Sequence, residues 1–492
     1  MTKLGTWKIA CAVFVLCAGT AIGSEAQIFQ TLVEFDGNDG AVPYGGVVQG
    51  VNGNFYGTTS GDGTNYYGTI FEVTPAGHLI ILYSFCSQPN CTDGASPASG
   101  LAQAGNGNFY GTTSIRGAND EGTVFEITAA GRLTTLYSFC SQTNCTDGAT
   151  PSAGLVQASN GNFYGTTLVG GTNAAGTVFE ISPAGKLTTL YSFCSKPSCA
   201  DGERPQAGLV QAENGKLYGT TYTGGVHGAG TIFEVVPAGG LTTVYNFCSR
   251  PNCTDGAYPA SGVVQATNGK LYGTTTVGGV NCLGSGGCGT IFEVAPTGKV
   301  TTRYSFCSKP NCSDGQIPGS GLVQATDGNL YGTTANGGIN CLPGVNCGTI
   351  FEINPSGKLT TLYNFCSQPN CSDGDQPWAT LLQATNGAFY GTTLGSSHTG
   401  LGDGTVYSLS TGLGPFVTFV RPAGKVGQTG GVLGQGFTGT TSVSLNGTSA
   451  SFTVKSDTLI LATVPSGATT GYVTVTTPTG TLTSNVPFHV IP

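Results

Sequence analysis

Seven aspartates recur along the chain at intervals of 54 or 59 residues, and glycine follows each of them directly. They are Asp39, Asp93, Asp147, Asp201, Asp255, Asp314 and Asp373. Hard cations such as calcium prefer oxygen ligands, so carboxylates gathered near one axis would predict a weak calcium site. The alternative is structural, because aspartate before glycine also favours an Asx turn with a hydrogen bond to nearby backbone. No other metal or cofactor is expected.

Cysteines form a second repeated pattern. Cys11 and Cys17 lie in an apolar N-terminal segment, and the other sixteen of the 18 cysteines fall in local pairs. The pairs are Cys86/Cys91, Cys140/Cys145, Cys194/Cys199, Cys248/Cys253, Cys307/Cys312, Cys366/Cys371, Cys282/Cys288 and Cys341/Cys347. An even number with no unpaired member predicts disulfide bonds in an exported chain. Zinc is the alternative, although the gap between the cysteines is unusual and no histidine accompanies them.

Two further groups of acidic residues are candidates for catalysis. Glutamates that follow phenylalanine recur at Glu72, Glu126, Glu180, Glu234, Glu293 and Glu352, and we interpret them as acceptors for backbone or threonine hydroxyl groups at a strand end. The single-copy pairs Asp120-Glu121 and Glu203-Arg204 could serve glycoside hydrolysis, which uses two carboxylates. The histidines His78, His227, His398 and His489 occupy unrelated positions, and no metalloprotease, nucleophile-elbow or phosphate-loop motif occurs. The sequence therefore predicts no catalytic residue.

These residues are positioned by an internal repeat. Tyr-Gly-Thr-Thr begins at Tyr56, Tyr110, Tyr164, Tyr218, Tyr272, Tyr331 and Tyr390. In the third copy, segments 154–157, 163–167, 176–181 and 187–193 are short and rich in β-branched and aromatic residues, which predicts four strands. Asn160-Gly161 and the segment 183–186 suit tight turns between them. The unit is a four-stranded antiparallel sheet.

Both faces of that sheet are expected to be apolar. In the fourth segment, Leu187, Tyr191 and Phe193 are placed on one face and Leu190 on the other. A sheet of this kind must be covered on both sides, as in the blades of a β-propeller. A solenoid is the alternative stack. The repeated Tyr and Thr residues are expected to pack within and between sheets, with sugar stacking as the other interpretation of the tyrosines.

The ends of the array favour a closed ring. The seventh copy lacks its fourth segment, whereas segment 28–35 is a fourth segment with no copy of its own. We therefore predict an all-β seven-bladed β-propeller over residues 27–411, closed by the N-terminal strand. In such a ring, the short turns lie on one face. The other face carries every cysteine pair and the variable loops, where binding residues tend to concentrate.

Composition and the N-terminus indicate export. Lys3 and Lys8 precede an apolar run over 9–22 and a small-residue site at Ser24-Glu25-Ala26, which predicts a signal peptide over 1–26. No later segment is long and apolar enough for a membrane span. Charged residues are only 9% of the chain and the net charge is −8, so nucleic acid is excluded as an expected partner.

Two resemblances follow from these motifs. The repeated Gly-Leu-Val-Gln, Asn-Gly-Asn-Phe-Tyr-Gly-Thr-Thr, Gly-Thr-Val-Phe-Glu and Leu-Thr-Thr-Leu-Tyr-Ser-Phe segments resemble the Gloeobacter/Verrucomicrobia (GloVer) tandem-repeat, choice-of-anchor family. That resemblance implies an exported bacterial surface protein and brings no catalytic residues. Residues 414–492 resemble an IPT/TIG immunoglobulin-like domain through Arg421-Pro422, Gly434-Gln435-Gly436-Phe437, Val464-Pro465 and Gly471-Tyr472.

The sequence predicts a non-enzymatic binding or scaffold protein that is secreted or held at the cell surface, with polysaccharide or a surface protein as its partner. The first alternative is an extracellular carbohydrate-active enzyme that uses acidic residues on the loop-rich face. The second is a structural component of a surface layer.

Overall fold

The computed structural model describes residues 27–282, 288–341, 347–396 and 402–491. The expected signal peptide at 1–26 and His398 lie outside these ranges. Within them, the chain is all-β apart from six 3-10 turns of three residues each: η1 (Pro89–Cys91), η2 (Thr143–Cys145), η3 (Pro197–Cys199), η4 (Pro251–Cys253), η5 (Pro310–Cys312) and η6 (Pro369–Cys371). None of these described helical segments is long and apolar enough to cross a bilayer.

Seven four-stranded antiparallel sheets in the described ranges take their strands from the repeats, and we number them repeat sheets 1 to 7. The first strands are β2 (Val48–Gln49), β6 (Ala102–Gln103), β10 (Val156–Gln157), β14 (Val210–Gln211), β18 (Val264–Gln265), β22 (Val323–Gln324) and β26 (Leu382–Gln383). The second strands are β3 (Phe55–Thr59), β7 (Phe109–Thr113), β11 (Phe163–Thr167), β15 (Leu217–Thr221), β19 (Leu271–Thr275), β23 (Leu330–Thr334) and β27 (Phe389–Thr393).

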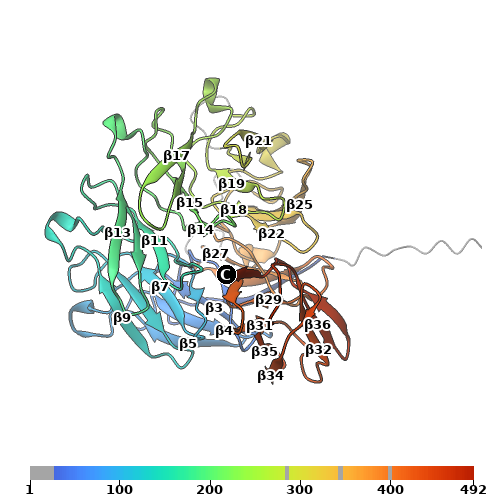
Figure 1. The fold of residues 1–492 in the computed structure, drawn as a ribbon. Helices are drawn as coiled ribbons and strands as arrows, with labels where there is room; N and C mark the ends of the chain where they lie inside the picture. Colours follow the sequence, from blue (N-terminus) through green and yellow to red (C-terminus); the bar gives the residue numbers. More distant parts are fainter. Residues whose placement is uncertain (1–26, 283–287, 342–346, 397–401, 492) are drawn as a thin grey trace, which may run out of the picture.

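The third strands are β4 (Thr69–Val73), β8 (Thr123–Ile127), β12 (Thr177–Ile181), β16 (Thr231–Val235), β20 (Thr290–Val294), β24 (Thr349–Ile353) and β28 (Thr405–Ser410). The fourth strands are β5 (Leu79–Ser84), β9 (Leu133–Ser138), β13 (Leu187–Ser192), β17 (Leu241–Asn246), β21 (Val300–Ser305) and β25 (Leu359–Asn364). Figure 1 shows the sheets side by side around a centre, with β14, β18 and β22 on the inside and β9, β13 and β17 on the outside.

The seventh sheet is completed by the N-terminal strand. β1 (Ile28–Glu34) pairs antiparallel with β28, from Ile28 opposite Ser410 to Glu34 opposite Thr405. The orphan fourth segment seen in the sequence is therefore the outer strand of the last repeat sheet. This pairing covers the edge of β28, which would otherwise present unpaired backbone groups.

Repeat sheet 7 also contacts repeat sheet 1 as internal neighbours contact each other. Thr392 Oγ1 donates to the carbonyl oxygen of Gly45 at 3.2 Å, and Thr58 Oγ1 makes the corresponding bond to the carbonyl oxygen of Ser99 at 2.8 Å. The rings of Phe55 and Tyr390 stack at 3.9 Å between centroids. Because the last and first copies meet through these repeated contacts, the array closes on itself.

The middle strands are buried on both faces, which explains their unbroken apolar and threonine-rich composition. All five residues of β11 are buried, and in β12 the single exception is Glu180. Threonine hydroxyls in these strands are paired, as with Thr167 and Thr177 at 2.9 Å. Each pair satisfies two polar groups that burial would otherwise leave unbonded.

The fourth strand differs from the expected alternation. Tyr191 pairs with Val178 and Thr189 pairs with Phe179, so Leu190 has no partner and forms a β-bulge. The extra residue reverses the alternation beyond it, which places Leu187 and Tyr191 on opposite faces. The prediction that these two residues share a face was wrong.

The C-terminal residues form two further four-stranded sheets and a short parallel pair. One sheet contains β29 (Thr418–Phe419), β31 (Thr429–Leu433), β35 (Leu459–Thr463) and β34 (Phe452–Ser456), and the other contains β33 (Thr448–Ser449), β32 (Ser442–Leu445), β36 (Val473–Thr477) and β37 (Gly480–Thr483). β30 (Ala423–Lys425) pairs parallel with β38 (His489–Ile491). Buried Val432, Ile460, Val443 and Val475 join the two sheets in one core.

Candidate binding surfaces

The connections between strands separate into two groups, and we name two surfaces from them. The turn face carries the short turns that join strands one to two and three to four, such as 158–162 and 182–186 in the third copy. The loop face carries the connections from strand two to three and from strand four to the next sheet. Because consecutive strands are antiparallel, these two groups lie at opposite ends of every sheet.

Six disulfide loops dominate the loop face. Each loop runs from a cysteine after the fourth strand through a 3-10 turn to the second cysteine and then to the repeated aspartate. The disulfide bonds are Cys86–Cys91, Cys140–Cys145, Cys194–Cys199, Cys248–Cys253, Cys307–Cys312 and Cys366–Cys371. Both cysteines of the second loop, Cys140 and Cys145, have positive φ angles, as does Asn144 between them. Closing so short a loop stabilises by about 2 kcal/mol in the chain-entropy model.

The aspartate holds each disulfide loop from inside. Asp147 is fully buried, and its Oδ2 accepts bonds from the Tyr137 hydroxyl at 2.7 Å and from the Ser141 backbone N–H at 2.9 Å. Its Oδ1 accepts a bond from the Gln142 N–H at 3.3 Å. The same set of donors surrounds Asp93, Asp201, Asp255, Asp314 and Asp373. The aspartates thus bind the loop that precedes them, and the Asx-turn interpretation was wrong for these six.

The hydrogen bonds to Asp201 favour its ionised form. At Asp201, burial alone would raise the pKa, but the bonds from Tyr191, Ser195 and Lys196 outweigh it and hold the pKa below its usual value. Burial and the neighbouring carboxylate raise the pKa of Tyr137 to about 12. Both oxygens of these six carboxylates accept hydrogen bonds from protein donors, and calcium binding stays a prediction for the set of seven.

Asp39 is the exception. It is partly exposed, and its Oδ1 accepts a bond from the Asp36 backbone N–H at 3.0 Å. Asp36, Asp62 and Asp403 line an open hollow of about 610 Å³ beside it. Burial, Asp62 and Asp36 together raise the pKa of Asp403. The first copy therefore has an acidic entry in place of a disulfide loop.

Two further disulfides, Cys282–Cys288 and Cys341–Cys347, lie in the longer connections between strands two and three of sheets 5 and 6. Among the described residues, one group of three metal-ligand side chains is close enough to share an ion: Cys282, Cys288 and Cys307. All three sulfurs are in disulfide bonds and are not thiolates, which are the form that binds zinc. These three cysteines therefore provide no free thiol for a zinc ion.

One repeat position on the loop face has a similar φ angle in every copy but a different side chain in each. It lies two residues after the Asp-Gly dipeptide, and its φ angle is between 52° and 57° in all seven copies. The residues are Val42, Ser96, Thr150, Arg204, Tyr258, Ile317 and Gln376. Each backbone N–H donates to the preceding sheet, as Arg204 does to Ala175 at 2.9 Å. Non-glycine residues rarely adopt this conformation, so the surrounding sheets must hold it.

Single-copy aromatic residues gather near this position. The rings of Tyr222 and Tyr258 lie 5.4 Å apart, and the exposed fraction of Tyr44 is 45%. The Trp378 ring lies against Gly319, where an added Cβ would come within 2.2 Å of the ring. Arg204 is exposed. These residues break the sevenfold regularity of the loop face. Each of them occurs at its repeat position in one copy only, and an alignment of the copies in the sequence would have revealed this.

The tyrosines of Tyr-Gly-Thr-Thr are structural. Tyr164 is fully buried, its hydroxyl donates to Glu180 at 2.9 Å, and Tyr110 stacks on Phe163 at 4.1 Å between centroids. The repeated glutamates accept from tyrosine, asparagine or basic side chains, with Asn162 as the second donor to Glu180 and Lys216 as a donor to Glu234, and not from threonine hydroxyls as expected. Burial of the Tyr164 ring leaves it no face for stacking a sugar.

The acidic pairs Asp120-Glu121 and Glu203-Arg204, which occur in one copy each, have contacts that differ from those of the repeated aspartates and glutamates. Asp120 forms an exposed ion pair with Arg116 at 3.2 Å, and the neighbouring Glu121 accepts from Thr150 Oγ1 at 3.4 Å. The Glu203 and Thr223 backbones pair as an isolated bridge. The structure therefore gives the carboxylates of Asp120 and Glu121 local partners on the loop face, whereas Glu203 is held there through its backbone.

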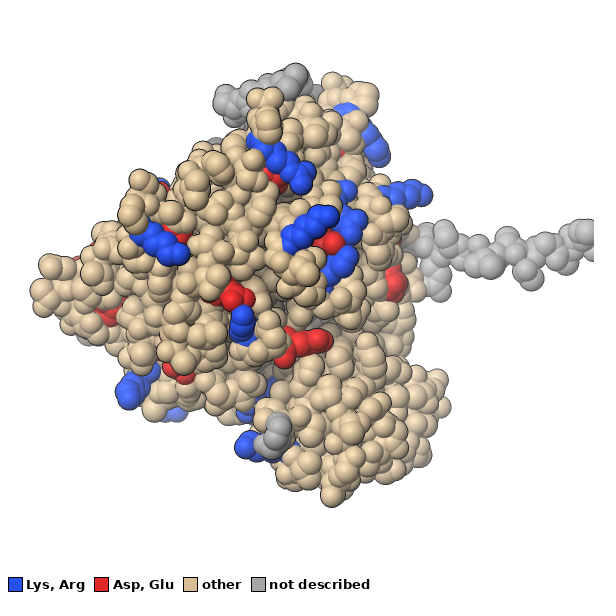
Figure 2. Space-filling model, turned by 45° about the horizontal axis from the view of Figure 1, so that its top comes forward, with Lys and Arg blue, Asp and Glu red and all other residues tan. Residues whose placement is uncertain are grey.

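The C-terminal sheets contact the turn face. Thr458 Oγ1 donates to the carbonyl oxygen of Val51 at 2.8 Å, and Arg421 donates to that of Ser159 at 3.0 Å. A cavity of about 430 Å³ remains between the two modules, lined by Gln157, Arg421 and Phe488 among others. Because Val51 and Ser159 both belong to short turns, this contact leaves the loop face open. Figure 2 shows how sparse charged residues are on the visible surface.

Comparison with known proteins identifies the repeat. The model of the Gloeobacter/Verrucomicrobia repeat matches residues 18–200, 195–371 and 284–448. No curated protein matches the chain. Among solved structures, a Bacteroides uniformis protein provisionally described as a 6-phosphogluconolactonase is 15% identical, with 66% of this chain and 84% of that chain covered and a TM-score of 0.42.

The periplasmic gluconolactonase PpgL of Pseudomonas aeruginosa is 13% identical, with 71% and 93% covered and a TM-score of 0.40. Similarity at this level gives no basis for transferring an activity. The family match, in contrast, spans most of the repeats. The chain belongs to the Gloeobacter/Verrucomicrobia repeat family.

Proposed function

We propose that this chain is an exported, non-enzymatic binding or scaffold protein that recognises its partner through the loop face. Its frame is a seven-bladed β-propeller closed by β1, with an immunoglobulin-like module of the IPT/TIG kind at the C-terminal end. Eight disulfide bonds support export to an oxidising compartment, where the protein is secreted or held at the cell surface.

One observation carries the proposal. Seven equivalent loop-face positions share one backbone conformation and carry seven different side chains. The disulfide loops and buried aspartates hold the frame around them rigidly. Side chains that vary on a fixed frame are the usual basis of recognition. The aromatic and polar residues among them, with Arg204 and Tyr258 as examples, suit a polysaccharide or a polar protein surface.

The contact of the C-terminal module with the turn face supports the same choice of surface. A partner that binds the loop face meets no obstruction from that module at Val51 or Ser159. The module is then free to act as a spacer or a second contact. Fold alone does not decide function, so the choice of ligand rests on these side chains.

The test is a glycan array run beside a reducing-sugar assay on the same polysaccharides. We expect binding without released sugar, and we expect Arg204→Ala combined with Tyr258→Ala to weaken it at least tenfold. Arg132→Ala is the matched control, because Arg132 is exposed in a turn on the opposite face. Released reducing sugar would support the carbohydrate-active enzyme instead. Self-association without glycan binding would support a structural surface layer.

A further inference from the structure

Repeat sheet 5 differs from the other sheets at one position of its outer strand. The bulged residue of the fourth strand is Leu82, Leu136, Leu190, Val244, Leu362 or, in β1, Leu32 in the other copies, and each packs against an apolar core cluster. In β21 the bulged residue is Arg303, which lies between the partners of Ile291 and Phe292. A residue that is apolar elsewhere is therefore a cation here.

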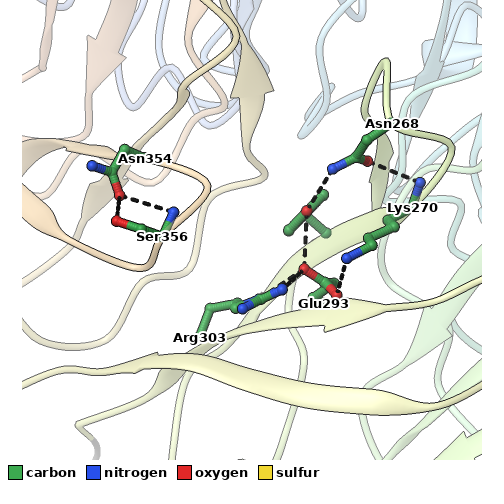
Figure 3. A network of polar contacts seen from close by, with 7 residues as sticks. Asn268, Lys270, Glu293, Arg303, Asn354 and Ser356 are labelled. Carbon is green, nitrogen blue, oxygen red and sulfur yellow. Dashed lines mark hydrogen bonds and ion pairs between the residues drawn. The ribbon is translucent and has the colours of Figure 1, made fainter.

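Arg303 turns back onto its own sheet. Its Nε donates to Glu293 Oε2 at 2.7 Å, and its Nη2 forms an ion pair with the same oxygen. Lys270 Nζ donates to Glu293 Oε1 at 2.8 Å, and the Tyr272 hydroxyl donates to Oε2 at 3.0 Å. Figure 3 shows Lys270 and Arg303 on either side of this carboxylate. Two cations share one carboxylate, which leaves one positive charge in excess.

Glu293 stays ionised in this arrangement. Burial would raise its pKa, but the bonds from Lys270, Arg303 and Tyr272 outweigh it and lower the pKa below the usual value. The neighbouring sheet provides the comparison. In sheet 4, Lys216 pairs with Glu234 at 2.7 Å, and Val244 occupies the position of Arg303, so the charges balance there. The excess charge therefore distinguishes sheet 5 from sheet 4.

A cavity of about 320 Å³ lies beside Arg303, between sheets 5 and 6. Sheet 5 lines it with Arg303, Asn268 and Tyr272, and sheet 6 with Leu330, Ile353 and Asn354. Asn354 Oδ1 already accepts bonds from Ser356 and Lys358, so the Asn354 side chain offers its amide N–H groups. The cavity thus combines an apolar wall with two side chains, Arg303 and Asn354, that can donate further hydrogen bonds.

We propose that this cavity binds a small organic carboxylate of about the size of a uronic acid. The carboxylate would lie between the Arg303 guanidinium and the Asn354 amide, and the ring would rest on Leu330 and Ile353. A volume near 300 Å³ is at the lower limit for small-molecule pockets. Guanidinium groups bind carboxylates through paired hydrogen bonds, which gives the site its preference for an acid over a neutral sugar. This site is separate from the loop face and does not depend on the function proposed for it.

The test uses isothermal titration of the full chain with sodium glucuronate, and with glucose as the neutral probe of the same ring. We expect saturable glucuronate binding that weakens as ionic strength rises, and glucose binding at least tenfold weaker. Arg303→Leu restores the residue type of the other copies and should reduce glucuronate affinity at least tenfold. Lys216→Ala, in the balanced network of sheet 4, should leave it unchanged.

Arg303→Lys keeps the charge without the planar fork, and we expect a smaller loss than with leucine. Circular dichroism of each variant establishes that the sheets are intact. Equal affinity for glucose and glucuronate would overturn the proposal. So would unchanged glucuronate affinity in Arg303→Leu. Loss of polysaccharide binding in the loop-face variant, with glucuronate binding retained, would show that the two sites are independent.

Discussion

The segment that enters repeat sheet 1 and the six disulfide loops make the same kind of connection between sheets, but they contain different residues. Both bring the chain from an outer strand to the next inner strand, and both begin at a buried phenylalanine, Phe35 or Phe139 for example. At the entry into repeat sheet 3, Asp147 follows Phe139 by eight residues, and Tyr137, Ser141 and both cysteines are present. At the entry into repeat sheet 1, Asp39 follows Phe35 by four residues, and all of those partners are missing together.

The difference shows which parts of the junction are necessary. Phenylalanine and the Asp-Gly dipeptide occur at both kinds of junction, so they are sufficient to join one sheet to the next. Tyrosine, serine, the disulfide and the burial of the aspartate occur as one unit. We infer that this unit adds a rigid projection to the loop face and is not required for the ring.

The largest expected effect comes from the shared phenylalanine. Phe35 and Phe139 each contact a third-strand phenylalanine, with ring centroids 5.2 Å apart in both cases. Phe35→Ala and Phe139→Ala should each lower the free energy of unfolding by roughly 3–5 kcal/mol. Only Phe35→Ala should also expose β28 to hydrogen exchange, because no disulfide loop holds that junction. Unchanged protection of β28 in that variant would contradict the comparison.

A smaller effect is expected from one disulfide. Cys140→Ser with Cys145→Ser removes a short covalent loop and should lower the free energy of unfolding by about 2 kcal/mol. Hydrogen exchange and limited proteolysis should increase in residues 140–147 and stay unchanged at the pairing of β1 with β28. Urea unfolding of the variant beside the oxidised wild type measures the difference. Opening of the whole ring would show that the loop is necessary after all.

The smallest effect separates the two kinds of aspartate. The pKa of Asp201 is lowered, so its ionised form stabilises the fold above pH 4, and this contribution is lost as the pH falls below that value. Asp201→Asn should therefore cost about 1–2 kcal/mol at pH 7 and less in acid. Burial raises the pKa of Asp39, so Asp39→Asn should cost nothing at pH 7. Thermal unfolding across pH 3–7 compares both variants, and equal losses would refute the distinction.

The repeat made most of the fold predictable, since four short β-rich segments recur with turn residues between them. The incomplete copy at each end indicated that segment 28–35 belongs with β28. The β-bulge at Leu190 was not predictable in this way. The sequence predicts which face a side chain occupies from strict alternation, and nothing in the residue pattern marks the one residue that is left unpaired. The contact between Arg421 and Ser159 was likewise not predictable, because it joins the C-terminal sheets to the repeat sheets through one residue from each.

The candidate sites likewise differ in how far the repeat pattern predicts them. Tyr137 and Asp147 recur together in every disulfide loop, so their partnership could have been inferred from co-occurrence in the repeat. Arg303 carried a signal of the opposite kind, because it departs from a position that is Leu or Val in other copies. The cavity beside it depends on the spacing of two sheets, and no residue pattern reports that spacing.

The pairing of β1 with β28 also governs the order of folding. It joins Ile28 to Ser410, so the first described strand of the chain waits for nearly all of the repeats to be synthesised. Contacts this distant in sequence form slowly, and β28 keeps a free edge during the delay. A second nascent chain could donate its own first strand to that edge. Concentrated refolding should therefore produce strand-exchanged dimers, each of which contains two complete rings.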